Sequence, residues 1–500
     1  MAAFTAIGVQ SQHDDNIVAK IIDEGKNRNQ VMDHLRHLTK NIGPRLTGSP
    51  QLQKACEYTM AKFKEYGLTN VHLEQWGEVP VGFERGKNST GKMVSPEVRN
   101  FEFTSPSWTP GTNGPLRGKA VKAPTTMEEF EKVKESLKGA WILMPPAAPR
   151  GGGGRGGGAG GGGGAGGGGG AGGGAAGADN QTPSPQVQLR EAIDGAGIAG
   201  RVQPSRNELV ITSGRYTGLT WETLPKTRTA IIRKSDMDAV TALLDAGKEV
   251  ELEFNLDQKF IPGPVPVYNV IADIKGTEKP DEMVIVSGHL DSWDGPGAEG
   301  ACDNGTGTMV AVETARILMK AGAKPKRTIR FIMWTGEEQG LHGSRRYVEM
   351  HKNELAKITC VFVDDGGTNY QGGVTCTAEM EPMLKAALEP AMKAFPDLPM
   401  QIRIAERIPA GGGSDHAPFN AAGVPGFFWF ETGRSDYNYV HHTQHDKFEM
   451  AIPEYLVQSS TNSAAASYIM ACAPTLLPRP AAPATAPARA NGAGGPPPKR

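Results

Sequence analysis

Acidic residues and histidines gather directly after several apolar runs in the second half of the chain. In chain order they are His289 and Asp291, Asp303, Glu337 and Glu338, Asp364 and Asp365, and His441 and His442. Each of the runs MVIVSG, TIRFIMWT, TCVFV and GFFWF reads as a buried strand that leads into such residues. The ends of parallel strands meet at one edge of an α/β sheet, so these side chains can converge there.

The types of these residues indicate a metal centre. Imidazole and carboxylate ligands without thiolate suit zinc better than manganese, cobalt or iron. Five ligand positions exceed the needs of one tetrahedral zinc ion that keeps a place for water. Two ions about 3.5–4 Å apart, sharing a carboxylate and a water molecule, account for the number. A carboxylate that binds no metal must then take the proton, and adjacent glutamates can divide these two tasks.

The elements that position these groups follow a β/α alternation. Helical segments such as TGTMVAVETARILMKAG and EPMLKAALEPAMKAF separate the short apolar runs after residue 265. This pattern predicts an α/β fold, a doubly wound, mostly parallel sheet with helices on both faces. Residues 16–43 and 49–68 read as amphipathic helices, and TNVHLEQW reads as a strand. We expect a discontinuous peptidase domain formed by residues 10–95 and 265–472.

Residues 96–264 have a different pattern of short apolar pieces, which predicts an inserted small α/β domain. Strand-like pieces (KAVKAP, AWILMP, ELVITS, TAIIRK, VELEF) surround two helical pieces, MEEFEKVKESLKG and SDMDAVTALLDAG. A glycine-rich tract at 146–186 has almost no side chains to bury, so it is expected to be a disordered loop. It lacks the lysine spacing of a phosphate-binding loop. The Pro/Ala-rich residues 473–500 are expected to be a disordered tail.

Charge and composition argue against nucleic acid and membrane partners. The net charge is −1, and no run approaches the ~20 apolar residues that span a bilayer. The five cysteines are scattered without a CxxC pair, so no disulfide framework can be read. The opening MAAFTAIGVQSQHDD lacks a basic segment and gives no clear signal peptide.

Several longer motifs can be read in the chain: HLDSWDGPGAEGACDNGTG, TGEEQGLHGS, DGGT, GGGSDHAPF, HTQHD and the N-terminal GPRLTGSPQ. They resemble those of the co-catalytic zinc aminopeptidase family (clan MH metallopeptidases), and within it the carboxypeptidase Q, or plasma glutamate carboxypeptidase, branch. The resemblance covers about residues 15–470. It implies the zinc exopeptidase fold with an inserted domain of protease-associated type.

The resemblance also implies a role for each site residue. Asp303 would bridge two Zn²⁺ ions, and the two remaining ligand pairs are Glu338 with His442 and His289 with Asp365. Glu337 would be the general base, which later protonates the leaving amine. Asp291 would hydrogen-bond the ring of His289 and fix its tautomer.

Two ligand choices rest on the family pattern. Asp365 is preferred to Asp364 because the ligand directly precedes a pair of small residues. His442 is preferred to His441 because the pattern reads His, three residues, Asp. One departure from the family is Cys302-Asp303-Asn304, where aspartates are more usual, and Cys302 suggests sensitivity to thiol reagents.

Other polar residues near the motifs have simpler interpretations. Ser414-Asp415-His416 cannot form a catalytic triad, because contiguous residues cannot face one another, and is read as support or substrate pocket. Tyr437 and Tyr439 are read as packed loop tyrosines, although either could stabilise an oxyanion. Arg45, Thr47 and Ser49 are expected to organise the N-terminal turn, and Cys360 to be inert core.

The function that the resemblance implies is metal-dependent hydrolysis of terminal peptide bonds in dipeptides or short peptides. Aminopeptidase or dipeptidase action is favoured over true carboxypeptidase action. The resemblance also suggests a homodimer and a secreted or periplasmic location. Two alternatives stay open: single-zinc acyl transfer of the glutaminyl cyclase type, and a non-catalytic, receptor-like binding module.

Overall fold

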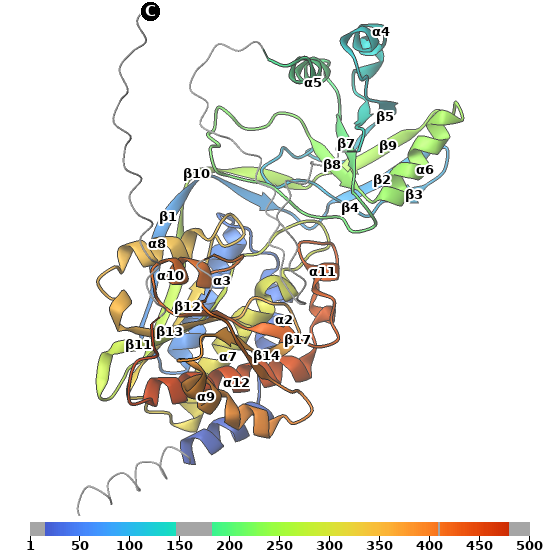
Figure 1. The fold of residues 1–500 in the computed structure, drawn as a ribbon. Coiled ribbons are helices and arrows are strands. Elements are labelled where there is room, and N and C mark those ends of the chain that lie inside the picture. Colours follow the sequence, from blue (N-terminus) through green and yellow to red (C-terminus); the bar gives the residue numbers. More distant parts are fainter. Residues whose placement is uncertain (1–15, 147–182, 409–410, 480–500) are drawn as a thin grey trace, which may run out of the picture.

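Two sheet-bearing parts make up the computed structural model of this chain, which describes residues 16–146, 183–408 and 411–479 (Figure 1). The larger part is built on a six-stranded sheet, here called the central sheet. The smaller part is built on an eight-stranded sheet, here called the insert sheet. The central sheet includes a long antiparallel ribbon formed by β1 (Thr69–Arg85) and β10 (Gln258–Ile274), which runs up toward the smaller part.

The central sheet is parallel in its middle and antiparallel at one side. Its strand order is β1, β10, β12 (Arg327–Trp334), β11 (Lys279–His289), β13 (Ile358–Val363) and β16 (Gly426–Phe428). Strands β12, β11, β13 and β16 pair in parallel, whereas β10 pairs antiparallel with both β1 and β12. The predicted strands at MVIVSG, TIRFIMWT and TCVFV therefore lie side by side.

Helices cover both faces of the central sheet. Successive side chains of a strand point to opposite faces, so Val284 and Val286 of β11 join one core while Met283 and Ile285 join another. The helices that share the first core are α2 (Val31–Arg36), α3 (Pro50–Glu65), α7 (Thr306–Ala321), α9 (Glu381–Ala394) and α12 (Pro453–Cys472). Those that share the second are α8 (His342–Met350) and α10 (His416–Ala421). The predicted α/β fold is confirmed at this level.

Short helical segments complete the larger part. A helix over residues 16–27 precedes α2, which continues into a π-helical turn, His37–Ile42. Single 3₁₀ turns lie at Leu355–Lys357 and Phe448–Met450. Helix α3 begins as its sequence predicts, with Ser49 accepting a hydrogen bond from the backbone of Leu52 and proline in the first turn. In the part of the chain that the structure describes, no helix is long and apolar enough to span a membrane.

The insert sheet has its own apolar core. Its order is β3 (Arg99–Asn100), β2 (Thr90–Ser95), β9 (Glu251–Asn255), β5 (Leu116–Lys122), β6 (Trp141–Leu143), β7 (Gly200–Pro204), β8 (Thr229–Ile232) and β4 (Phe103–Thr104). Trp141, Val202 and Phe254 are fully buried in that core. Helix α6 (Lys234–Asp245) packs against it, while α4 (Met127–Leu137) and α5 (Pro185–Gly195) form a further cluster around Leu137 and Ile193.

Two strand predictions fail. ELVITS (residues 208–213) is not a regular strand; it makes one isolated bridge, between Ile211 and Thr443. GFFWF divides at Trp429, because β16 joins the central sheet while β17 (Phe430–Thr432) joins β14 (Tyr370–Cys376) and β15 (Gln401–Ile404) in a separate small sheet. The apolar pattern alone reveals neither the missing sheet partner of ELVITS nor the change of sheet at Trp429.

The two predicted disordered segments lie mostly outside the described residues. Of the glycine-rich stretch 146–186, residues 147–182 lie outside, and α5 begins within its predicted end. Of the tail 473–500, the structure describes residues 473–479. The domain boundaries stay predictions, although β2 already belongs to the insert sheet, just before the predicted start of the insert.

Candidate metal centre

The predicted site residues come together at the carboxyl ends of the parallel strands. His289 is the last residue of β11, and Asp365 follows β13 by two residues. Glu337 and Glu338 follow β12, and Asp303 lies in the segment Ala301–Gly305, which leads into α7 and is kinked by non-helical backbone angles at Asp303 and Asn304. The fifth position, His442, follows the short helix α11 (Tyr437–Val440). This edge is where open α/β sheets bind their ligands.

Asp303 lies between two groups of candidate ligands. Its Oδ1 atom is 3.4 Å from Nε2 of His289, and its Oδ2 atom is 3.1 Å from Nε2 of His442. The same Nε2 of His289 is 3.0 Å from Oδ1 of Asp365. Nε2 of His442 is 3.0 Å from Oε2 of Glu338. One carboxylate thus faces both imidazoles, as a bridging ligand must.

The close alternatives in the sequence differ in their surroundings. Asp364 is not among the carboxylates that form an ion pair with His289, and its Oδ2 atom accepts a hydrogen bond of 2.6 Å from the amide of Gln371. His441 is nearer: its Nε2 atom is 3.8 Å from Oδ2 of Asp303, and its ring stacks on that of His442 with centroids 3.8 Å apart. The distances therefore place Asp365 and His442 closer to the other candidate ligands than their sequence neighbours.

The donor set fits divalent cations. Three carboxylates (Asp303, Glu338 and Asp365) and two imidazoles converge without a thiolate, which is a zinc-type set. Within the described residues, Oε1 of Glu338 is buried and has no hydrogen-bond partner. Buried polar atoms are normally paired, so this oxygen is available to a ligand.

Electrostatics also favour a bound cation. Burial and the charge of Asp303 raise the pKa of Glu338 to about 7. Burial lowers the pKa of both histidines, but the carboxylates around them, led by Asp365 for His289 and Glu338 for His442, raise it well above its ordinary value. The carboxylates near both histidines thus surround them with negative charge, which a bound cation would offset.

Glu337 lies beside the candidate ligands but farther from His289 than Asp303 and Asp365 do. Its Oε2 atom is 4.0 Å from Nε2 of His289, and its side chain is 10% exposed. Burial is the main cause that raises its pKa well above the ordinary value, with further contributions from Asp365 and Asp415. A buried carboxylate with a raised pKa can hold a proton, as a general base needs to do.

Asp291 supports the loop that carries the two glutamates. Its Oδ1 atom accepts the backbone N–H of Glu337 at 3.2 Å, and its Oδ2 atom accepts that of Glu338 at 3.4 Å. Oδ2 also accepts the hydroxyl of Thr47 at 2.8 Å. Nδ1 of His289 lies closer to the backbone oxygen of Asp291, at 3.0 Å, than to its carboxylate, at 3.7 Å. The main chain of Asp291 thus makes the contact expected of its side chain.

Arg45 has a larger role than the sequence indicated. The fully buried guanidinium donates to the carbonyls of Leu290 and Gly300 at 2.7 Å each, and to those of Gly43 and Glu299. It therefore fixes the loop 290–300 between His289 and Asp303, not only the N-terminal turn. The motif GPRLTGSPQ pointed to this residue, but its distant partners could not be read from the sequence.

The remaining motif residues surround the centre. Asp415 is buried, and its burial raises the pKa of its carboxyl to about 7. The negative charges of Asp365 and Asp291 contribute to the same shift. Tyr437 is half-buried, and its ring lies against Gly367 and 4.8 Å from the ring of His441, whereas Tyr439 is 41% exposed and stacks on His445. Neither Asp415 nor Tyr437 has an ion pair or ring contact with the five candidate ligands.

The surroundings of Cys302 argue against the expected sensitivity to thiol reagents. Cys302 is fully buried, and burial, with the charge of Asp446, raises the pKa of its thiol well above the ordinary value. A buried neutral thiol is a poor nucleophile. Cys360 is likewise fully buried in the core, as expected.

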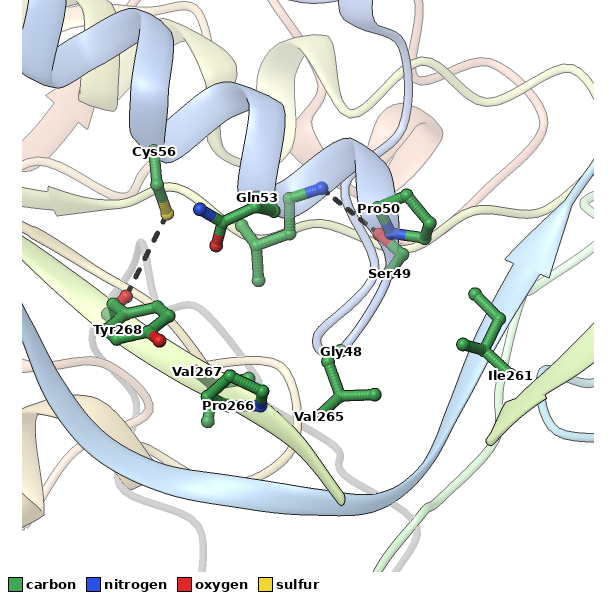
Figure 2. A pocket seen from close by; sticks show the side chains of 11 residues that line it. Gly48, Ser49, Pro50, Gln53, Cys56, Ile261, Val265, Pro266, Val267 and Tyr268 are labelled. Atoms are coloured by element: carbon green, nitrogen blue, oxygen red, sulfur yellow. Dashed lines mark hydrogen bonds between the residues drawn. The ribbon is translucent and has the colours of Figure 1, made fainter. Parts of the chain in front are cut away.

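A cavity of about 300 Å³ lies apart from these residues (Figure 2). Its walls come from the start of α3 and from residues 261–268 of β10. Figure 2 shows Cys56 and Tyr268 at one end and Gly48 and Ile261 at the other. None of the candidate metal ligands lines it, so it is not the metal centre.

Comparison with known proteins places these features in context. Residues 269–467 match the family described as peptidase family M28. Carboxypeptidase Q from Bos taurus is 26% identical over 482 residues, which are 95% of this chain and 93% of that protein. The matched family region contains the five candidate ligands.

Two solved structures share the fold. A peptidase M28 precursor from Shewanella amazonensis superposes with a TM-score of 0.62 at 24% identity, covering 93% of this chain and 98% of that one. The zinc aminopeptidase BSAP from Bacillus subtilis superposes with a TM-score of 0.53 at 20% identity, covering 88% and 93%.

Proposed function

We propose that this chain, a metallopeptidase of family M28, is a zinc-dependent exopeptidase that hydrolyses terminal peptide bonds of dipeptides or short peptides. The observation that carries the proposal is the position of Asp303, whose two carboxylate oxygens face His289 and His442 at 3.4 and 3.1 Å. In this reading Asp303 is shared by two Zn²⁺ ions. His289 and Asp365 complete one ligand set, and Glu338 and His442 complete the other.

The ligand set suits the chemistry that the family implies. When bound, a zinc pair polarises the scissile carbonyl and lowers the pKa of water toward neutrality. The chain itself supplies the proton acceptor: Glu337 takes a proton on its carboxylate and returns it to the leaving amine. Its burial supports this role, because a raised pKa helps the side chain hold the proton between the two steps. Asp291 holds the backbone of Glu337 in place.

The inserted part is proposed to be a separate domain of protease-associated type, spanning residues 96–264. Its own apolar core around Trp141 and Phe254 supports a separate unit. Tyr216 of the insert packs 5.9 Å from His342, close to the loop of the two glutamates. The insert would therefore narrow access to the site, which favours small substrates. A homodimer and a secreted or periplasmic location remain predictions.

Two alternatives differ in their metal content. A cyclase-like acyl transferase would use one zinc ion, and a receptor-like module would need none. The presence of both candidate ligand groups and of Glu337 favours the peptidase. The relatives named above as carboxypeptidase Q and as a zinc aminopeptidase point the same way.

The test combines metal analysis with a substrate panel. The purified protein is dialysed against metal-free buffer, its zinc content is measured, and it is assayed on dipeptides and aminoacyl anilides. We expect two zinc ions per chain and hydrolysis that releases single amino acids. One zinc ion per chain, or two with no hydrolysis of any peptide in the panel, would reject the proposal.

A further inference from the structure

A segment of the insert reaches across to the loop that carries His442. This segment, residues 208–212, lies within the stretch 208–213 that the sequence predicts as a strand. The backbone N–H of Thr212 donates to the carbonyl of His442 at 2.8 Å, and Ile211 forms an isolated antiparallel bridge with Thr443. Residues more than two hundred positions apart in the chain therefore meet directly beside a candidate metal ligand.

Gln444 joins the same two parts through its side chain. Its Oε1 atom accepts the backbone N–H of Val210 at 2.7 Å. Its Nε2 atom donates to the carbonyl of Glu208 and to Oε2 of Glu102, both at 3.1 Å. The side-chain hydrogen bonds of Gln444 thus go to the insert, and the residue is only 8% exposed. Removal of this side chain would leave the backbone N–H of Val210 and the backbone carbonyl of Glu208 without these hydrogen bonds.

The backbone at His442 is one that needs external support. Its φ angle is +61°, in the left-handed region that residues other than glycine seldom adopt. Such conformations persist where the surrounding structure fixes them, and they are common at functional sites. The carbonyl of His442 is held by Thr212, so the insert contributes directly to this fixation.

The same segment also contacts the loop after His289. A Cβ atom at Gly295 would collide with the side chain of Thr212, so these residues are in close contact. Trp293, in that loop, has its ring edge-on to His442 with centroids 5.9 Å apart. The insert segment therefore lies against two loops of the candidate centre, at the side where His442 enters it.

We propose that the inserted domain is a structural part of the metal centre, and that Gln444 is a positioning residue that holds His442 in ligand position through segment 208–212. The inference rests on the proposed zinc function, because His442 is a ligand only in that proposal. Gln444 contacts neither substrate nor metal; it acts through the loop. The consequence is that the insert sets the affinity of the zinc ion bound by His442 and Glu338.

The test measures zinc retention rather than turnover. Wild type and Gln444→Ala, each loaded with zinc, are dialysed against a graded series of chelator concentrations, and zinc per chain is measured. Loss of a partner that orients a ligand costs about 10- to 100-fold in metal affinity. We expect Gln444→Ala to lose one of its two zinc ions at a chelator concentration about 10-fold or more lower than wild type does. The second ion should be lost at the same chelator concentration as in wild type.

A matched control is Gln258→Ala. Gln258 is a buried amide of similar exposure, 7%, and it also holds insert backbone, through the carbonyl of Thr109 at 2.9 Å. It makes no contact with residues 442–444 among its hydrogen bonds. This variant should show wild-type zinc retention even if its unfolding midpoint falls as much as that of Gln444→Ala.

A donor–acceptor exchange tests the contact itself. Gln444→Glu removes the amide donor and places two carboxylates together, so it should weaken retention of one zinc ion. Adding Glu102→Gln restores a donor opposite an acceptor at that contact but not at the carbonyl of Glu208, so the double variant should recover part of the loss. Recovery also separates positioning from a general folding defect. A second substitution would not be expected to repair a folding defect, whereas it can restore a specific contact.

The outcomes separate this inference from the proposed function. If wild type does not bind two zinc ions, the proposed function fails first. If wild type binds two and Gln444→Ala retains both like wild type, the proposed function stands and the positioning role is overturned. Equal loss of both ions in Gln444→Ala and Gln258→Ala would also overturn it, because the effect would then be one of stability.

Discussion

The carboxylate of Asp291 accepts the backbone N–H of Glu337 at 3.2 Å. Because the next N–H, that of Glu338, points to the other oxygen of the same carboxylate, one buried side chain orients both glutamates. Their side chains then take different positions. Glu338 lies 3.0 Å from Nε2 of His442, and Glu337 lies 4.0 Å from Nε2 of His289. A shared anchor thus separates a proposed ligand from a proposed base.

Replacement of this anchor should reduce catalysis more than stability. Asp291→Asn keeps the size of the side chain but leaves one acceptor where two backbone donors and Thr47 now converge. We expect kcat to fall about 10- to 100-fold, with KM less affected. Thr47→Val, which removes one donor and no acceptor, should cost less than 10-fold. Steady-state kinetics on one dipeptide measures both, and a larger loss in the threonine variant would contradict the assignment.

Arg45 should be among the most sensitive positions for stability. Arg45→Met removes the cation that pairs with four backbone carbonyls in the interior. Loss of a buried charged partner typically costs about 3–5 kcal/mol of unfolding free energy. The control Lys134→Met removes an exposed pair with Glu131, which should cost less than about 1 kcal/mol. Urea unfolding measures both, and equal losses would show that Arg45 does not hold the loop.

The zinc-free protein should lose stability as pH rises. The folded-state pKa of Glu338, about 7, lies above that of an exposed glutamate, so its stabilising contribution is complete at low pH and is lost as pH rises through 7. Raised pKa values of His289 and His442 act in the same direction. Zinc displaces these protons and binds more tightly as pH rises.

The measurement compares urea midpoints of zinc-loaded and chelator-treated protein between pH 5 and pH 8. We expect the gap between the two forms to widen steadily with pH. A gap that stays constant or narrows would show that the cluster is not the zinc site, because ligand protonation would then not compete with metal binding.

Thiol reagents should modify the chain without inhibiting it. Four of the five cysteines, Cys302 included, are buried, and Cys472 is partly exposed. Mild alkylation should therefore label Cys472, the last residue of α12, first, with activity kept. Mass spectrometry of the labelled peptides locates the modification. Rapid labelling of Cys302 with loss of activity would contradict the buried position of that side chain.

The sequence was informative wherever local pattern decides structure. Strand β11 could be recognised because its apolar residues are continuous and end in His289, and α7 because its apolar spacing is helical and it ends before Gly322. The meeting of the strand ends at one edge of the sheet then followed from general rules for α/β folds. The chemistry of the candidate site could be inferred from the residue types at those strand ends.

Contacts between distant segments could not be read in the same way. Arg45 donates to Leu290, which lies 245 positions away, and nothing local to Arg45 marks that partner. Segment 208–212 has the composition of a strand but forms an isolated bridge, between Ile211 and Thr443. Trp429 interrupts one apolar run because the residues on either side pair with different sheets. In each case the deciding partner is tertiary.

The most direct test of the account is the zinc content and activity of Glu337→Gln. The substitution keeps the size of the side chain but removes its ability to accept a proton, and the five proposed ligands are unchanged. We predict two zinc ions per chain, as in wild type, and a kcat for dipeptide hydrolysis lower by about 10²-fold or more. A variant that keeps both zinc ions and wild-type kcat would contradict the account, because Glu337 could then not be the base.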